Sequence, residues 1–274
     1  MGAESSLPRR LATAFVLLAV MAGLVWTPQL RPVFSLFIAG LSCIGLREYY
    51  ALVRQRGIAT EAFGGIAAGT AVVLSAHLGL PAVTSVALFA GFVLVLLLHL
   101  ARGEHSLEGM ATSLFGVFYA GWLPSHMLLL HGAPGGAGLV TLLVAAVALT
   151  DAGAFLGGKG FGRRKLAPVL SPNKTWEGAA SGFVVAIAGM VVVWLLSRRF
   201  GTFPRWGVAR FVVAGAVVSL AAQAGDLAES CLKRSAGVKD SGRLLPGHGG
   251  VLDRADGFLF ATPILYYMLI LLLG

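Results

Sequence analysis

The sequence predicts an all-α polytopic integral membrane protein, with about nine transmembrane helices in one bundle and a cytoplasmic N-terminus. Of its 274 residues, 57% are hydrophobic and only 12% are charged, and the mean hydropathy is +0.83. An ordinary soluble domain is much more polar than this. Apolar stretches of about 20 residues, the length that crosses a bilayer as a helix, recur along the whole chain.

Nine such stretches define the expected spans. The first follows a basic flank and could be a secretory signal, but more membrane follows it and no soluble domain, so we expect a retained helix. Without an internal repeat or a long polar linker, residues 1–274 are expected to form a single membrane domain. The expected spans are residues 11–29, 33–53, 62–80, 82–101, 110–131, 137–156, 178–197, 208–230 and 256–273.

Basic residues are distributed unevenly over the predicted loops. With nine spans, the N-terminus and every second loop carry fifteen of the 21 Lys and Arg residues, the opposite loops carry five, and Arg47 lies inside a span. The positive-inside rule then places the N-terminus in the cytoplasm and the C-terminus outside. Basic loops could simply fix this topology and attract anionic headgroups. That reading leaves the last third of the chain unexplained, because acidic residues accompany the cations there.

Three of these charged residues share one face of a predicted helix. In "AQAGDLAESCLKR", Asp226, Glu229 and Lys233 are separated by three and four residues, a spacing that aligns side chains on a helix. Glu229 and Lys233 alone could form a surface pair worth only ~0.3–0.5 kcal/mol. Asp226 follows a long apolar run, however, and a carboxylate at such depth should be paired with a cation or a metal.

Two further carboxylates stand where the last span begins. Asp253 and Asp256 have the same spacing of three residues if the last helix starts near Leu252. Carboxylates on two helices offer the oxygen ligands that Mg²⁺ prefers when waters and substrate phosphates complete its shell. We expect Asp226 and Asp253 to bind the metal, with Asp256 assisting. A competing reading is that Asp253 pairs with a nearby cation and only holds the last two helices together.

The loop between these two helices favours anion binding. In "SAGVKDSGRLLPGHGG", Lys239, Arg243 and His248 alternate with glycines, which allow backbone N–H groups to approach an anion. Cations, a flexible backbone and a carboxylate-held metal together indicate a polyphosphate site. His248 could orient a phosphate or donate a proton, or it could fix a turn.

The other polar segment, "SPNKTWEG" at residues 171–178, is interpreted as a helix start. Ser171 or Thr175 could cap the helix, and free N–H groups, Lys174 and two hydroxyls would then converge on an anion. For Ser171, helix capping without any role in anion binding is a serious alternative.

The upstream segment "GAFLGGK" has P-loop spacing, but Gly160 stands where the Mg²⁺-binding Ser or Thr belongs, so we reject a P-loop.

These segments resemble a known family. "SCLKRSAGVKDSGRLLPGHGGVLDRAD", residues 230–256, is similar to the signature of the phosphatidate cytidylyltransferases, or CDP-diacylglycerol synthases, and "GDLAES" and "SPNKTWEG" resemble that family's other landmarks in the expected order. One departure is Ala255, where the family usually has a larger apolar residue. The resemblance covers residues 151–257, whereas residues 1–150 agree only as membrane spans.

The resemblance implies a dimeric, multi-pass enzyme of the cell membrane. Its active site is expected on the cytoplasmic side, because the acidic residues of the second half lie at span ends or in loops assigned to that side. The enzyme would use CTP and Mg²⁺, with a second cation as an open alternative, to convert phosphatidate into CDP-diacylglycerol and pyrophosphate; no nucleic-acid partner is expected. Residues 151–274 would form the catalytic half. The implied catalytic residues are Asp226, Asp253, Asp256, Lys233 and His248, the metal ligands are Asp226, Asp253 and Asp256, and the substrate-binding residues are Ser171, Asn173, Lys174, Thr175, Arg234, Lys239, Asp240, Arg243 and Arg254.

Other functions remain as alternatives. A CTP-dependent lipid kinase would share the membrane spans and the nucleotide site, but it would form a phosphorylated lipid and CDP. A CDP-alcohol phosphotransferase would need the pattern DGxxARx₈GxxxDxxxD, which is absent. A transporter of anionic solutes could also place charges in a helical bundle, but the charges here lie in predicted loops more than along a path through the membrane.

Overall fold

The computed structural model describes residues 20–103, 106–199, 201, 203–242 and 249–272. Within these residues helices dominate, as expected for an all-α membrane protein. The first half contains η1 (Pro28–Leu30), α2 (Arg31–Gln55), α3 (Ala62–Ser75), η2 (Ala76–Leu78), α4 (Pro81–Ala101), α5 (Leu107–Gly116), the π-helical η3 (Val117–Trp122) and α6 (Leu123–Gly132). The second half contains α7 (Gly136–Phe161), β1 (Lys165–Ala167), β2 (Ser171–Thr175), α8 (Trp176–Ser197), α9 (Val208–Ser235) and α10 (Leu252–Leu272).

Seven helices within the described residues are long and apolar enough to cross a membrane, and each coincides with a predicted span. The span expected at 62–80 is a shorter apolar helix, Ala62–Leu78. It ends because Gly79 adopts a left-handed φ of 69° and Pro81 then begins α4. The span expected at 11–29 lies largely outside the described residues, and its described part is helical over residues 20–26. The total of nine spans stays a prediction.

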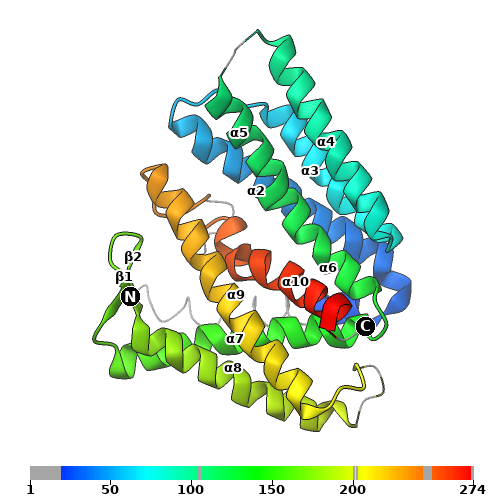
Figure 1. Cartoon of the computed structure of the whole chain (residues 1–274), viewed down its shortest axis with the longest axis vertical. Helices are drawn as coiled ribbons and strands as arrows, with labels where there is room; N and C mark the ends of the chain where they lie inside the picture. The colour runs from blue at the N-terminus through cyan, green and yellow to red at the C-terminus, as the bar shows by residue number, and fades with distance from the viewer. Residues whose placement is uncertain (1–19, 104–105, 200, 202, 243–248, 273–274) are drawn as a thin grey trace, which may run out of the picture.

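Helix α10 lies between two groups of helices (Figure 1), one formed by α2 to α6 and the other by α7, α8 and α9. It packs against α9, α6, α7 and α2. A single cluster of buried apolar side chains draws on both groups, with Phe34, Leu143, Phe211 and Leu265 among its members. The two halves of the chain therefore share one core, and α10 joins them.

A β-hairpin separates α7 from α8. Its strands pair antiparallel, with Lys165 opposite Thr175 and Ala167 opposite Ser171. Thr175 caps α8 as predicted, because its Oγ1 accepts a hydrogen bond of 3.1 Å from the Gly178 amide. Capping by Ser171 is wrong: strand pairing places this residue four positions before the cap. The segment 171–175 is thus a strand that leads into a helix.

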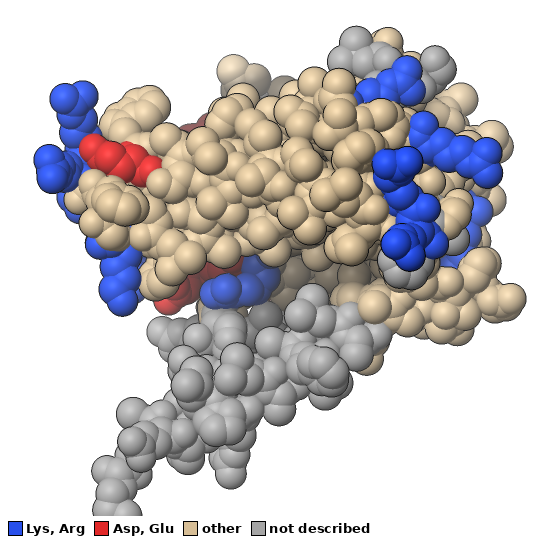
Figure 2. Space-filling model, turned by 90° about the horizontal axis from the view of Figure 1, so that it is seen from below, with Lys and Arg blue, Asp and Glu red and all other residues tan. Residues whose placement is uncertain are grey.

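Charged side chains lie mainly at two ends of the molecule, and a broad apolar surface lies between these ends (Figure 2). In Figure 2, Lys and Arg gather at the two ends of the molecule, and the surface between them is largely uncharged. The end of α8 and the start of α9 carry Arg198 and Arg210, whereas the hairpin side carries Lys159, Arg164 and Lys165. This arrangement is typical of a membrane protein, whose uncharged belt faces the hydrocarbon.

Candidate active site

Helices α7, α9 and α10 and strand β2 bring seven charged side chains together near the hairpin end of the molecule. We call these residues the polar cluster. It combines five carboxyl groups with two ammonium groups. Its members are Asp151 on α7, Lys174 on β2, Asp226, Glu229 and Lys233 on α9, and Asp253 and Asp256 on α10.

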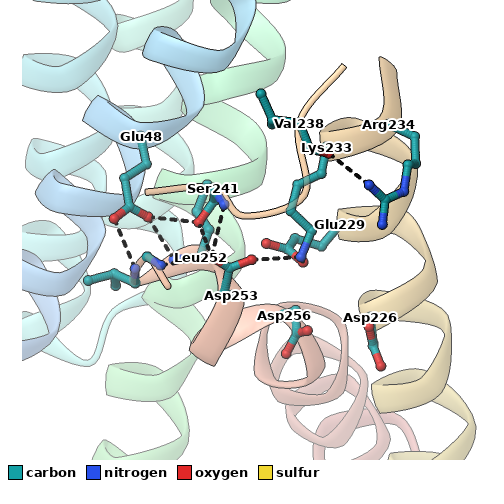
Figure 3. Close-up of polar contacts among 12 residues, drawn as sticks. Glu48, Asp226, Glu229, Lys233, Arg234, Val238, Ser241, Leu252, Asp253 and Asp256 are labelled. Atoms are coloured by element: carbon teal, nitrogen blue, oxygen red, sulfur yellow. Dashed lines mark hydrogen bonds and ion pairs between the residues drawn. The ribbon is translucent and has the colours of Figure 1, made fainter. Parts of the chain in front are cut away.

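Lys233 links the two helices that carry most of these carboxylates. Helix α9 continues to Ser235, as predicted, and α10 begins at Leu252, the start that the alignment of Asp253 and Asp256 required. Lys233 Nζ lies 2.5 Å from Glu229 Oε2 and 2.6 Å from Asp253 Oδ1 (Figure 3). Because the Glu229 side chain is only 1% exposed, the interpretation of Glu229 and Lys233 as a surface pair is wrong. The pair belongs to a buried network.

Asp253 has protein partners on both carboxylate oxygens. Oδ1 pairs with Lys233, and Oδ2 accepts hydrogen bonds from the Ser241 amide at 2.9 Å, the Ser241 hydroxyl at 2.9 Å and the Gly250 amide at 2.7 Å. A metal ligand would need to give up some of these contacts. The geometry therefore favours a structural role for Asp253 over metal binding. In this role, Asp253 holds the last two helices and their connecting loop together.

Glu48 on α2 completes this anchor, although it lies in none of the sequence motifs. Its Oε1 accepts a hydrogen bond of 3.0 Å from the Val251 amide, and Oε2 accepts bonds from the Leu252 amide at 2.9 Å and the Ser241 hydroxyl at 3.2 Å. The first amides of a helix lack intrahelical partners and favour negative charge, so Glu48 caps α10. The signal was a carboxylate inside an expected apolar span, which tends to mark function.

Two adjacent glycines allow the loop backbone to come close to the Glu48 and Asp253 carboxylates. Gly249 has a left-handed φ of 78°, which residues with a side chain rarely adopt. A Cβ atom at Gly250 would collide with the Ser241 hydroxyl and the Glu48 carboxylate. The "GG" of the loop is therefore needed for the backbone to reach the Glu48 and Asp253 carboxylates.

Asp226 and Asp256 lie side by side on α9 and α10, next to the Lys233 network (Figure 3). Lys174 Nζ lies 2.5 Å from Asp226 Oδ2, and Asp256 Oδ1 accepts a hydrogen bond of 2.7 Å from the Gly257 amide. Asp226, Asp256 and Asp151 are close enough to repel one another. The Asp226 side chain is 36% exposed, so a ligand can reach it.

This pair of carboxylates suits a magnesium ion. No group of three or more His, Cys, Asp or Glu side chains among the described residues is arranged to hold a metal. Mg²⁺, however, is commonly bound through one or two carboxylates, with substrate phosphates and waters completing its octahedron. A cation would also relieve the crowding of the Asp151, Asp226 and Asp256 carboxylates.

The other predicted site residues are placed as follows. Arg234 donates from Nε to the Leu170 carbonyl at 3.1 Å and from Nη1 to the Val238 carbonyl at 3.0 Å, so it ties the hairpin turn to the end of α9. The Thr175 hydroxyl is used by the α8 cap. Ser171 is partly exposed, and Asn173, Lys239, Asp240 and Arg254 are exposed. Arg243 and His248 lie outside the described residues.

Ion-paired carboxylates and lysines at the ends of the spans mark a functional site in a polytopic membrane protein. The chain matches the Cytidylyltransferase family over residues 8–272, and it belongs to that family. The match includes the N-terminal half, where the residue motifs gave no resemblance beyond membrane spans.

Curated relatives agree with this assignment and with the resemblance noted in the sequence. The phosphatidate cytidylyltransferase of Synechocystis sp. is 35% identical over 273 residues, which cover 88% of this chain and 89% of the relative. That of Brucella suis biovar 1 is 38% identical over 267 residues, covering 96% and 93%. Phosphatidate cytidylyltransferase 4, chloroplastic, of Arabidopsis thaliana is 34% identical over 267 residues, covering 85% and 66%.

Proposed function

We propose that this protein transfers the cytidylyl group of CTP to phosphatidate at the polar cluster, forming CDP-diacylglycerol and pyrophosphate. Family membership supports the reaction class, and the name that the relatives share supports the lipid substrate. The observation that carries the site assignment is the pairing of Asp226 and Asp256 beside Lys174, on membrane helices and accessible to a ligand. A lipid phosphate could reach this site from the membrane, and a nucleotide could reach it from the aqueous side.

The reaction needs charge neutralisation more than it needs a base. A phosphate oxygen of phosphatidate, ionised near neutral pH, attacks the α-phosphorus of CTP, and the bond from that phosphorus to the oxygen bridging it to the β-phosphorus breaks. Pyrophosphate then leaves, and no proton has to be removed first. The main obstacle is repulsion between the two anions, which fixed cations and metal ions lower.

Lys174 is the cation best placed to face substrate. Its side chain is 25% exposed, while its Nζ atom is buried and pairs with Asp226, so it would meet a phosphate bound beside Asp226 by exchanging this partner for the phosphate. Lys233 is held between Glu229 and Asp253 and is 14% exposed. Lys233 therefore orients α9 and α10, and Lys174 provides the charge that meets the substrate.

Asp226 and Asp256 would hold Mg²⁺, with Asp151 close enough to help bind a second cation. A magnesium ion held by these carboxylates would supply positive charge against the charge that develops on the leaving pyrophosphate. Asp253 would act as the anchor of the loop 236–251. Arg243 stays a predicted phosphate ligand, and His248 stays a residue predicted to orient a phosphate, donate a proton or fix a turn.

The site would open to the cytoplasm of a multi-pass protein in the cell membrane, with nine spans, a cytoplasmic N-terminus and an external C-terminus. The excess of basic residues in the loops on the hairpin side supports this orientation. The family resemblance supports a homodimer. Cross-linking in native membranes, followed by sizing of the product, tests the dimer.

One experiment separates the proposed reaction from a lipid kinase. The purified protein in detergent receives phosphatidate, Mg²⁺ and CTP that carries ³²P at either the α- or the γ-phosphate. A cytidylyltransferase moves the α-label into lipid and leaves the γ-label in pyrophosphate, whereas a kinase moves the γ-label into lipid. Transfer of the γ-label, or no transfer of either label, would refute the proposal.

A further inference from the structure

Tyr119 is a buried tyrosine whose hydroxyl has no hydrogen-bond partner among the described residues. The residue is 1% exposed and lies on η3 (Val117–Trp122), the π-helical segment between α5 and α6. Leaving a buried polar group unpaired costs roughly 1–3 kcal/mol, and π-helical segments occur often at functional sites. The unpaired hydroxyl and its place on a π-helical segment both need an explanation.

The contacts of Tyr119 place it beside the polar cluster. Its ring packs edge-on against Phe260 of α10, with centroids 6.5 Å apart. Phe260 follows Asp256 by one helical turn on the same face, and Leu232 of α9 packs against the same buried cluster as Tyr119. The hydroxyl is within electrostatic reach of Glu229, Asp256 and Asp226. An unpaired donor therefore borders the carboxylates proposed to hold the metal.

The neighbouring buried tyrosines behave differently. The Tyr50 hydroxyl donates to the Ser113 carbonyl at 2.7 Å, and the Tyr49 hydroxyl donates to the Thr112 carbonyl at 2.8 Å. Both lie in the same buried cluster as Tyr119. Local packing can thus satisfy a tyrosine hydroxyl in this region, and at Tyr119 it does not.

We propose that Tyr119 is a substrate-binding residue of this enzyme, whose hydroxyl donates a hydrogen bond to a phosphate oxygen bound at Asp226 and Asp256. The inference rests on the proposed function and extends the site to the N-terminal half of the chain. A phenolic O–H can donate at neutral pH without carrying a charge, so it adds a directed contact to the anion where Lys174 adds charge. The phosphate belongs to CTP or to phosphatidate, which share this chemistry.

The test compares Tyr119→Phe with Tyr50→Phe, because each removes one hydroxyl from a tyrosine that is 1% exposed. Steady-state kinetics are measured with CTP and phosphatidate varied separately. Melting temperatures are measured without ligand and with Mg²⁺ plus CTP or phosphatidate. Wild-type activity on these substrates is established first, so that failure of the proposed function is recognised independently.

We expect Tyr119→Phe to lower kcat/KM about 10- to 100-fold, the effect of losing one hydrogen bond to a charged group. Its melting temperature without ligand should equal or exceed that of the wild type, because an unpaired polar atom has been removed. Stabilisation by one substrate should shrink, and the substrate concerned identifies the phosphate. Tyr50→Phe should instead melt at a lower temperature and keep the ligand-induced shifts.

Two results would overturn the proposal while the wild type remains active. One is an unchanged kcat/KM together with unchanged stabilisation by both substrates in Tyr119→Phe. The other is a lower melting temperature without ligand and normal ligand-induced shifts, because that pattern would mean that the hydroxyl already has a structural partner in the free protein.

Discussion

Glu48 and Leu252 are separated by 204 residues, yet Glu48 Oε2 accepts a hydrogen bond of 2.9 Å from the Leu252 amide. This contact attaches the first turn of α10 to α2. Asp256 lies one turn further along α10, so its position depends on where that helix begins. A residue far from the sequence motifs therefore sets the geometry of the proposed metal site.

Removing the Glu48 carboxylate should destabilise the protein. Glu48→Ala removes the acceptor of the Val251 and Leu252 amides, while the Ser241 hydroxyl keeps Asp253 as an acceptor, and an unpaired buried group costs roughly 1–3 kcal/mol. Glu48→Gln keeps one acceptor oxygen and should lose less. Thermal unfolding in detergent measures both, with the exposed Glu108→Ala as a control that should melt close to the wild type. An unchanged melting temperature in Glu48→Ala would contradict the capping role.

Lys174→Ala should reduce turnover while the protein stays folded. The change removes the ammonium paired with Asp226, and with it the charge proposed to meet a substrate phosphate. We expect a loss of 10-fold or more in kcat/KM, by analogy with other electrostatic contacts in active sites, and partial recovery in Lys174→Arg. Lys165→Ala changes an exposed lysine on the other strand of the hairpin and should keep wild-type turnover. Equal turnover in the two alanine variants would leave Lys174 with no catalytic role.

Local sequence patterns were sufficient to locate most helices. Seven of the expected spans coincide with long apolar helices, because hydrophobic length is a local property of the chain. The spacing of Asp226, Glu229 and Lys233 likewise placed them on one face of α9. The alignment of Asp253 and Asp256 required the last helix to start near Leu252, four residues before the expected span, and α10 starts there.

Contacts between distant segments could not be predicted in this way. The Ser241 and Gly250 partners of Asp253 come from a loop that is also bound by Glu48, and no local pattern shows which carboxylate oxygens are already occupied. Tyr119 is similar, since its sequence neighbours read as an ordinary apolar span and its approach to Phe260 depends on how α10 packs. The strand at 171–175 was missed because five residues with a proline and two hydroxyls carry no clear alternation.

The C-terminus should lie outside the cell if the polar cluster faces the cytoplasm. Helix α10 begins at the cluster and crosses the bundle away from the hairpin (Figure 1), so one crossing separates its two ends. An alkaline phosphatase fusion after Gly274 should be active, and a green fluorescent protein fusion at the same position should not fluoresce. Insertion of the same reporters into the hairpin turn at residues 168–170 should give the opposite pattern. A fluorescent C-terminal fusion would contradict the proposed orientation.

Substitution of single aspartates by asparagine should separate the carboxylates that bind metal from the one that anchors the loop. Asp→Asn keeps the shape of the side chain and removes one charge. Asp226→Asn and Asp256→Asn should each raise the Mg²⁺ concentration needed for half-maximal turnover and lose most activity, and the double variant should lose little more, because groups that act as a unit are non-additive. Turnover against Mg²⁺ concentration, measured together with the melting temperature, checks each variant.

Asp253→Asn should behave differently, because Asp253 is already bound to Lys233, Ser241 and Gly250. Loss of its charge replaces one of the two carboxylates beside Lys233 with a neutral amide, while Glu229 still pairs with Lys233. The melting temperature should therefore fall, but by less than the ~3–5 kcal/mol typical of a fully broken buried pair. The fraction that stays folded should keep the wild-type dependence on Mg²⁺. If Asp253→Asn instead kept its melting temperature and needed far more Mg²⁺, Asp253 would be a metal ligand, and its contacts in the free protein would have to rearrange when the metal binds.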